Sequence, residues 1–150
     1  MGALYNNEFE NTKTSIAEQD INKIEETFKF NFPTDFRRHY LIYNGGRPKK
    51  HVFIDEDYEF IVGYFIPIKY GVNDRILERV LEIFRDDQDF PNWLIPFADE
   101  PGGNLYCFSI DPDEEGAIYY WNHEIEDPEE SYSYLAESLK EFIDSMVENE

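Results

Sequence analysis

An acidic loop between two short β-prone runs has the residue spacing that comes closest to metal chemistry. Residues 111–118 read DPDEEGAI, so acids stand at loop positions one, three and five, glycine at six and an apolar residue at eight. This is the start of a calcium-binding loop. Position twelve, however, is Asn122, where such a loop needs a bidentate glutamate. A strand-like run rather than a helix follows, so the sequence predicts an acidic hairpin turn and not a cation site.

The three histidines and the single cysteine do not form a metal-ligand or nucleophile pattern. A zinc site around His123 would need further His or Cys ligands, and only His39 and His51 remain. Cys107 stands in a strand-like run within strongly acidic sequence, whereas a reactive thiolate needs an electropositive setting. We predict that it is a small buried side chain. A chain without paired cysteines suits a reducing compartment.

Sequence motifs of catalysis are also missing: the chain has no P-loop, no nucleophile elbow and no dinucleotide fingerprint. With 33 acidic residues in the chain, acid pairs are too common for spacing to nominate a general acid and base. We therefore expect a protein that is not an enzyme and that binds no cofactor and no metal. An acidic hydrolase stays open as an alternative, and it would need a pocket with two convergent carboxylates.

The net charge of −20 is unevenly distributed. Residues 111–150 hold 14 acids and one base, Lys140, whereas residues 1–110 hold 19 acids and 12 bases. Such a field repels nucleic acid and anionic lipid, and it attracts a basic partner. We therefore expect no direct binding to nucleic acid or membrane. General solubility explains the same charge without any partner.

No segment of the sequence reads as a signal for membranes or secretion. Residues 1–13 lack the basic and apolar regions of a signal peptide. The longest near-apolar run, residues 60–68, contains a glycine and a proline and is far shorter than a bilayer span. We expect a soluble, cytoplasmic protein.

The elements that position these residues are predicted from apolar spacing and turn signals. Helices and strands occur in blocks rather than in strict alternation, which favours an α+β fold. Residues 1–14 are predicted to be a flexible segment ahead of a single domain at residues 15–150. The expected helices are residues 15–28, 34–43, 73–85 and 131–147, and the first of them starts at a capping box from Ser15 or at Asp20. The expected strands are residues 51–54 and 60–68, with two or three more strands within residues 93–124.

Three segments of the chain, in this order, resemble the SUKH superfamily, which includes bacterial immunity proteins and the domain of a yeast cell-wall-assembly regulator. Order and spacing match over about residues 16–147, nearly the whole chain. The first segment, within residues 24–46, is a helix, Pro33 and a second helix ending at Asn44-Gly45-Gly46. The second is the run LIPFA at residues 94–98 with Gly103-Asn104 and a strand at residues 105–110. The third is a strand at residues 116–123.

The resemblance implies a mainly antiparallel central sheet flanked by helices, without catalytic activity. Bacterial members are typically antidotes to polymorphic toxins, whose payloads are often nucleases. A nuclease site is usually basic because it holds a polyanion, so an acidic protein can mask it. We interpret the chain as an immunity protein, or antitoxin, that neutralises a cognate toxin domain of the nuclease type. The alternative is a regulatory or scaffold module that binds an endogenous cytosolic protein.

The candidate partner-binding residues lie in the loops and strand ends of residues 93–124, where binding groups commonly sit. They are Asp99, Glu100 and Asn104 in one turn, Asp111, Asp113 and Glu114 in the acidic loop, and Trp121, His123 and Glu124 at a strand end. Trp121 is the best aromatic anchor, since tryptophan is enriched at binding hot spots. Core packing would explain Trp121 equally well, and solvation would explain the acids. Oligomeric state and the identity of the toxin stay open at this point.

Overall fold

The computed structural model describes residues 5, 7–72 and 75–148 of the 150-residue chain. These residues form four helices and eight short strands, so the fold is α+β, as predicted. The helices are α1 (Glu18–Phe28), α2 (Thr34–Ile42), α3 (Leu77–Arg85) and α4 (Leu139–Asp144). The strands are β1 (Phe9–Glu10), β2 (Arg47–Pro48), β3 (Val52–Asp55), β4 (Tyr58–Ile61), β5 (Leu94–Asp99), β6 (Leu105–Ser109), β7 (Ile118–Trp121) and β8 (Tyr132–Ala136).

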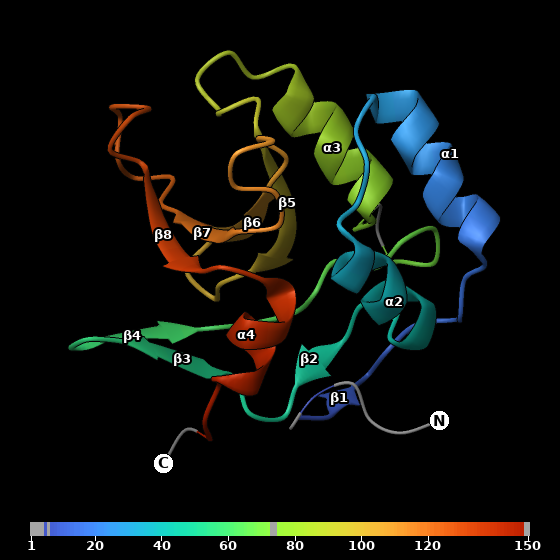
Figure 1. Ribbon diagram of the computed structural model, residues 1–150, viewed down its shortest axis with the longest axis horizontal. Helices are drawn as coiled ribbons and strands as arrows, with labels where there is room; N and C mark the ends of the chain where they lie inside the picture. Colours follow the sequence, from blue (N-terminus) through green and yellow to red (C-terminus); the bar gives the residue numbers. More distant parts are fainter. Residues whose placement is uncertain (1–4, 6, 73–74, 149–150) are drawn as a thin grey trace.

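The largest sheet has the strand order β5-β6-β7-β8, and each neighbouring pair in it is antiparallel. Strands β1 and β2, and strands β3 and β4, form two further two-stranded sheets. In Figure 1 the four-stranded sheet lies at the upper left, α1 and α3 lie at the upper right, and the β3–β4 hairpin extends to the lower left. None of the described helices is long and apolar enough to cross a membrane.

The four-stranded sheet carries buried side chains on both of its faces, because side chains alternate in direction along a strand. On one face Phe108 packs against Phe36 of α2, with ring centroids 4.2 Å apart, and Phe97 packs against Phe142 of α4 at 6.2 Å. Cys107 lies in a second buried cluster on the other face, and burial raises the pKa of its thiol. The prediction of a small buried cysteine is confirmed.

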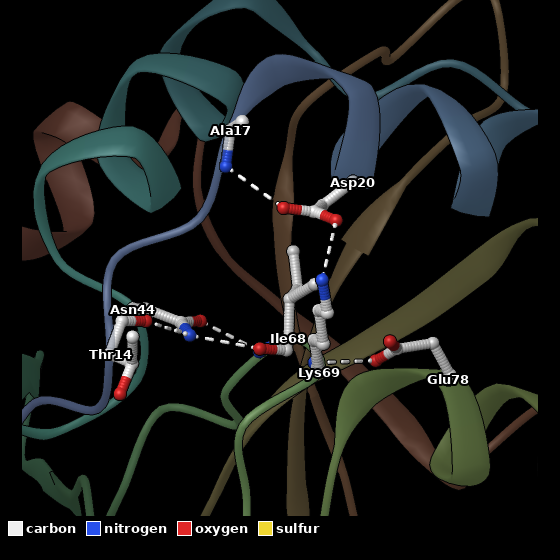
Figure 2. Close-up of polar contacts among 7 residues, drawn as sticks. All are labelled: Thr14, Ala17, Asp20, Asn44, Ile68, Lys69 and Glu78. Atoms are coloured by element: carbon white, nitrogen blue, oxygen red, sulfur yellow. Dashed lines mark hydrogen bonds and ion pairs between the residues drawn. The ribbon is translucent and has the colours of Figure 1, made fainter.

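The buried side chain of Asn44, just after α2, ties three segments of the chain together (Figure 2). Its Nδ2 donates to the carbonyl oxygens of Thr14 and Ile68, at 2.8 Å each. Its Oδ1 accepts from the backbone N–H of Ile68 at 2.7 Å. Three of the four hydrogen bonds that an asparagine side chain can form are therefore made. They hold the end of α2 between the N-terminal segment and the segment that follows β4.

The two glycines after Asn44 let these segments approach closely. Gly45 and Gly46 have φ angles of +76° and +92°, in the left-handed region that favours glycine. A Cβ on Gly45 would lie 2.8 Å from the Cβ of Pro67, and one on Gly46 would lie 2.6 Å from the carbonyl oxygen of Glu10. The sequence predicts that the glycines stop α2 by a left-handed cap, but α2 ends earlier, at Ile42, with Tyr43 in extended backbone. Gly45 and Gly46 instead make room for the chain on both sides of them.

Lys69, next to Ile68, connects α1 with α3 (Figure 2). Its Nζ lies 3.4 Å from Oδ1 of Asp20, and its backbone N–H donates to Oε1 of Glu78 at 3.1 Å. The other oxygen of Asp20 accepts from the N–H of Ala17 at 2.9 Å. The backbone N–H of Ala17, the residue just ahead of the first helical turn, thereby gains a hydrogen-bond partner. The predicted helix start at Ser15 is therefore wrong, because the Asp20 carboxylate fixes the start at Glu18.

The predicted C-terminal helix at residues 131–147 is wrong in its first half. Residues 132–136 form β8, and α4 begins only at Leu139. The residues of β8 alternate tyrosine with small or apolar side chains, which suits a strand that pairs with β7. Ser138 then starts the helix, because its side chain accepts from the N–H of Glu141 at 3.1 Å.

Two other elements are shorter than the sequence predicts. The strand expected at residues 60–68 ends at Ile61, and residues 63–66 instead run beside β5, where Gly63 and Ile66 donate to the carbonyl oxygens of Asp99 and Phe97. A Cβ on Gly63 would lie 2.2 Å from Oδ1 of Asp99, so glycine permits this contact. The helix expected at residues 73–85 begins at Leu77; residues 73–74 lie outside the described residues.

The described part of residues 1–14, the segment predicted to be flexible, packs onto the rest of the chain. Tyr5 and Asn7 are buried, and Phe9 and Glu10 pair with β2. The backbone N–H of Lys13 donates to the carbonyl oxygen of Asn44 at 2.8 Å. Isolated aromatic residues provide this packing, so no apolar periodicity marks it in the sequence.

Replacing Asn44 by alanine should lower the free energy of unfolding by about 2–4 kcal/mol, because buried backbone groups of Ile68 and Thr14 would lose their partner. Urea denaturation measures this change, with the exposed Asn92→Ala as the control expected to stay within about 0.5 kcal/mol of wild type. Equal stability of the two variants would contradict the role given to Asn44.

His39 should make the fold sensitive to acid. It is fully buried among aromatic rings, and this burial lowers its pKa from 6.5 to about 3. Below pH 6.5 the unfolded chain therefore binds a proton that the folded chain does not, and stability falls as the pH falls, by about 2 kcal/mol in all between pH 7 and pH 5 from this group. Unfolding free energies measured from pH 7 to pH 5 should show that loss for wild type relative to His39→Phe. Parallel curves for the two proteins would contradict it.

Candidate partner-binding surface

The four-stranded sheet lies in the part of the chain that has no basic side chains. Residues 86–139, here called the acidic segment, contain 15 acidic residues and no lysine or arginine. Every ion pair formed between described residues uses an acid outside this segment. No ion pair between described residues therefore neutralises an acid of this segment, and its negative charge is carried mainly by the loops around β5 to β8.

Four side chains form a hydrogen-bonded cluster, the sheet-end cluster, where β5 and β7 end and β6 begins: Glu100, Asn104, Tyr120 and His123. The hydroxyl of Tyr120 donates to Oε2 of Glu100 at 2.7 Å, and Nδ2 of Asn104 donates to both residues. Oδ1 of Asn104 accepts from the N–H of His123 at 3.0 Å and lies 2.6 Å from its Nδ1. Partial burial and the bond to Glu100 raise the pKa of Tyr120.

The sheet-end cluster brings together three of the residues that the sequence nominates, Glu100, Asn104 and His123. Sequence reasoning missed Tyr120, which bonds both Glu100 and Asn104. Strand alternation could have found it, because Tyr120 lies on the opposite face from Trp121 and its ring packs against Phe60 at 5.0 Å. The cluster holds two loops in one fixed arrangement, which is the property of a preorganised binding surface.

The other nominated residues at this end of the sheet are placed differently. Asp99 turns toward the segment after β4, where its Oδ1 accepts from the N–H of Tyr64 at 2.8 Å, and burial raises its pKa. Trp121 packs against Phe84 and Phe90, with ring centroids 5.6 and 5.1 Å away. Glu124 is exposed beside the cluster.

Asp111, Asp113 and Glu114 lie at the opposite end of the sheet. The hairpin loop between β6 and β7 carries them, and β6 itself, with five residues, spans about 16 Å. Oδ1 of Asp111 accepts from the N–H of Asp113 at 3.0 Å, which closes the turn. The nine nominated residues therefore form two groups at the two ends of the sheet rather than one continuous site.

Four aromatic side chains cover the outer face of β7 and β8, and we call them the aromatic face: Trp93, Tyr119, Tyr132 and Tyr134. Neighbouring ring centroids lie 5.0 to 5.8 Å apart, mostly edge to face. Tyr134 is 50% exposed. Glu114 accepts from the hydroxyl of Tyr119 at 2.7 Å.

Tyr134, the exposed member of the aromatic face, lies in a negative electrostatic field. Desolvation and the negative charges of Glu141, Glu137 and Glu114 raise the pKa of Tyr134. Sequence reasoning nominated Glu114 only. It missed the aromatic face because the error at residues 131–147 placed Tyr132 and Tyr134 on a helix. A surface of this kind, aromatic and acidic together, suits a basic protein side chain.

The described residues offer no site for a bound metal ion, since they contain no cluster of three or more His, Cys, Asp or Glu side chains with suitable placement. A cavity of about 440 Å³ lies between the N-terminal segment and the segment after β4. Among its described lining residues, Lys13 and Arg75 are basic and Asp99 is the acid. The pair of convergent carboxylates that an acidic hydrolase requires is not formed there.

The amino-acid sequence of the chain matches the SMI1 / KNR4 family (SUKH-1) over residues 15–145. The chain belongs to this family. The matched region contains all four helices and β2 to β8, and with them the sheet-end cluster and the aromatic face. The family resemblance that the sequence carries in its three segments is thereby confirmed, and this SUKH-1 domain extends over nearly the whole chain.

Among curated proteins, this SUKH-1 chain is similar to the SPbeta prophage-derived uncharacterized protein YokK of Bacillus subtilis (strain 168). The two sequences are 36% identical over 81 residues, which cover 53% of this chain and 40% of that protein. The chain therefore spans less than half the length of this relative.

Asn104 should hold the sheet-end cluster together. In Asn104→Ala the N–H of His123 loses its acceptor, so its exchange with solvent deuterium should become roughly fivefold or more faster. The amide of Glu124, which donates to Oδ1 of Asn122 instead, is the internal control and should keep its rate. Nuclear magnetic resonance measures both amides in one sample, and an unchanged rate at His123 would contradict the cluster.

Proposed function

We propose that this SUKH-1 protein is an immunity protein that binds a cognate toxin domain of the nuclease type and neutralises it by covering its basic active site. Family membership supports this class of function, because SUKH family members are known as immunity proteins and not as enzymes. The similarity to a prophage-derived protein is consistent with it.

The observation that carries the proposal is the unneutralised charge of the acidic segment. Its 15 acidic residues are accompanied by no lysine or arginine within the segment and form no ion pair among the described residues. Like charges gathered in this way repel one another and lower stability, so a partner of opposite charge would relieve a cost that the isolated domain carries. A nuclease active site has that charge, because it binds a polyanion.

The geometry supports binding by a preformed surface. The sheet-end cluster fixes Glu100, Asn104 and His123 before any partner arrives, so little side-chain freedom is lost on binding. Exposed Glu124 adds charge beside the cluster, and the loop acids Asp111, Asp113 and Glu114 add charge at the other end of the sheet, which speeds encounter. Asp99 and Trp121 contribute by holding the surface in place, through the segment after β4 and through the second buried cluster.

Co-expression with the toxin domain encoded beside this gene tests the proposal. Cells that produce the toxin should survive only when this protein is present, and the purified pair should bind with an affinity that falls as salt is raised. Equal killing with and without this protein would refute immunity. A stable complex with a host protein in cells that lack any toxin gene would favour the regulatory or scaffold alternative.

The position of the binding surface can be tested with two variants of equal charge. Glu124→Gln with Glu126→Gln removes two exposed charges beside the sheet-end cluster, and affinity for the toxin domain should fall roughly tenfold at low salt. Glu18→Gln with Glu26→Gln removes two exposed charges from α1, and the affinity of this variant for the toxin domain should stay within about twofold of wild type. Equal losses in both variants would show that net charge, and not this surface, determines binding.

A further inference from the structure

Strand β8 is an edge of the four-stranded sheet, and its outer side is open. At the other edge, residues 63–66 cover β5 by hydrogen bonds to Phe97 and Asp99. β8 pairs only with β7 within the described residues. An open edge presents backbone groups that can pair with another strand.

The register of the β7–β8 pair shows which backbone groups of β8 face outward. The N–H of Asn122 donates to the carbonyl oxygen of Ser131 at 2.7 Å, so these two residues form a hydrogen-bonded pair. Hydrogen-bonded and non-hydrogen-bonded pairs alternate along an antiparallel ladder. The backbone N–H and C=O groups of Ser133, which lies opposite Tyr120, therefore bond to β7. Tyr132 and Tyr134 direct their N–H and C=O groups to the open side.

Side chains on this edge favour a basic strand. A residue of an added strand directly opposite Tyr134 would lie on the aromatic face, with its Cβ about 4.5–5.5 Å from that of Tyr134. There it would meet the half-exposed ring of Tyr134, within the negative electrostatic field of Glu114, Glu137 and Glu141. Lysine or arginine at that position gains both a ring contact and opposite charge. At the other end of β8, Glu129 and Glu130 are also exposed.

We propose that β8 binds an extended, lysine- or arginine-bearing segment of a partner protein as an added strand, with one basic side chain against Tyr134. This rests on the proposed function, since the toxin domain is taken as the partner that supplies the strand. A second copy of this chain does not fit the same edge, because each copy carries a net charge of −20 and two acidic edges repel each other. Leu135, an extra residue in β8 opposite the Ile118–Tyr119 step of β7, limits the open edge to about three residues.

Hydrogen exchange at three consecutive amides tests this inference in the complex of the full chain with the toxin domain encoded beside its gene. In the free protein the amide of Ser133 should exchange more slowly than those of Tyr132 and Tyr134. On binding, the amides of Tyr132 and Tyr134 should slow at least roughly tenfold, while Ser133, already bonded to β7, changes less. A tight complex in which Tyr132 and Tyr134 keep their free rates would overturn the strand while leaving the immunity function intact. Failure to form any complex would overturn the proposed function together with the inference.

A pair of tyrosine variants tests the basic contact. Tyr134→Ala should weaken the complex at least tenfold, whereas Tyr58→Ala, which removes a 71% exposed ring from the tip of the β3–β4 hairpin, should change the affinity less than twofold. Equal effects of the two variants would overturn the contact at Tyr134. Formation of a dimer of this chain in which Tyr132 and Tyr134 become protected without the toxin domain would overturn the choice of partner.

Discussion

The buried amide of Asn44 is the constraint on which the rest of the structure depends. The side chain joins the N-terminal segment, the end of α2 and the segment after β4 through three hydrogen bonds. The segment after β4 in turn covers the outer edge of β5. One edge of the four-stranded sheet is thereby closed, and β8 is left as the open edge. Gly45 and Gly46 are required for this arrangement because any side chain there would collide with the neighbouring segments.

The structure separates two kinds of charge chemistry. Basic residues and the ion pairs of the described residues lie outside the acidic segment, as where Arg37 of α2 bonds Glu25 of α1 at 2.9 Å. The acidic segment forms the four-stranded sheet and its loops without such pairs between the described residues. Its polar side chains instead bond each other in the sheet-end cluster. The ion-paired part and the acidic segment thus lie in different parts of one small domain.

Much of the fold could be predicted from the sequence, because apolar spacing marks α1 and α2 and turn residues mark the β5-β6-β7 meander. The errors lie where tertiary pairing overrides local pattern. Tyr132 to Ala136 fits a helical apolar face with the residues after it, but β7 needs a partner and takes this run as a strand. Three of the nominated site residues meet in the sheet-end cluster, since loops at one end of a hairpin are close in space. The aromatic face could not be predicted once its two outer tyrosines had been assigned to a helix.

The central claim is that the acidic segment is the surface that meets a basic toxin domain. Carbodiimide cross-linking of the complex, read by mass spectrometry, measures this directly because it joins carboxylates of one protein to lysines of the other in contact. The account predicts cross-links from acids within residues 86–139, with Glu124 and the residues around Tyr134 among them. Cross-links from Glu18, Glu26 and other acids of α1, with none from the acidic segment, would contradict it.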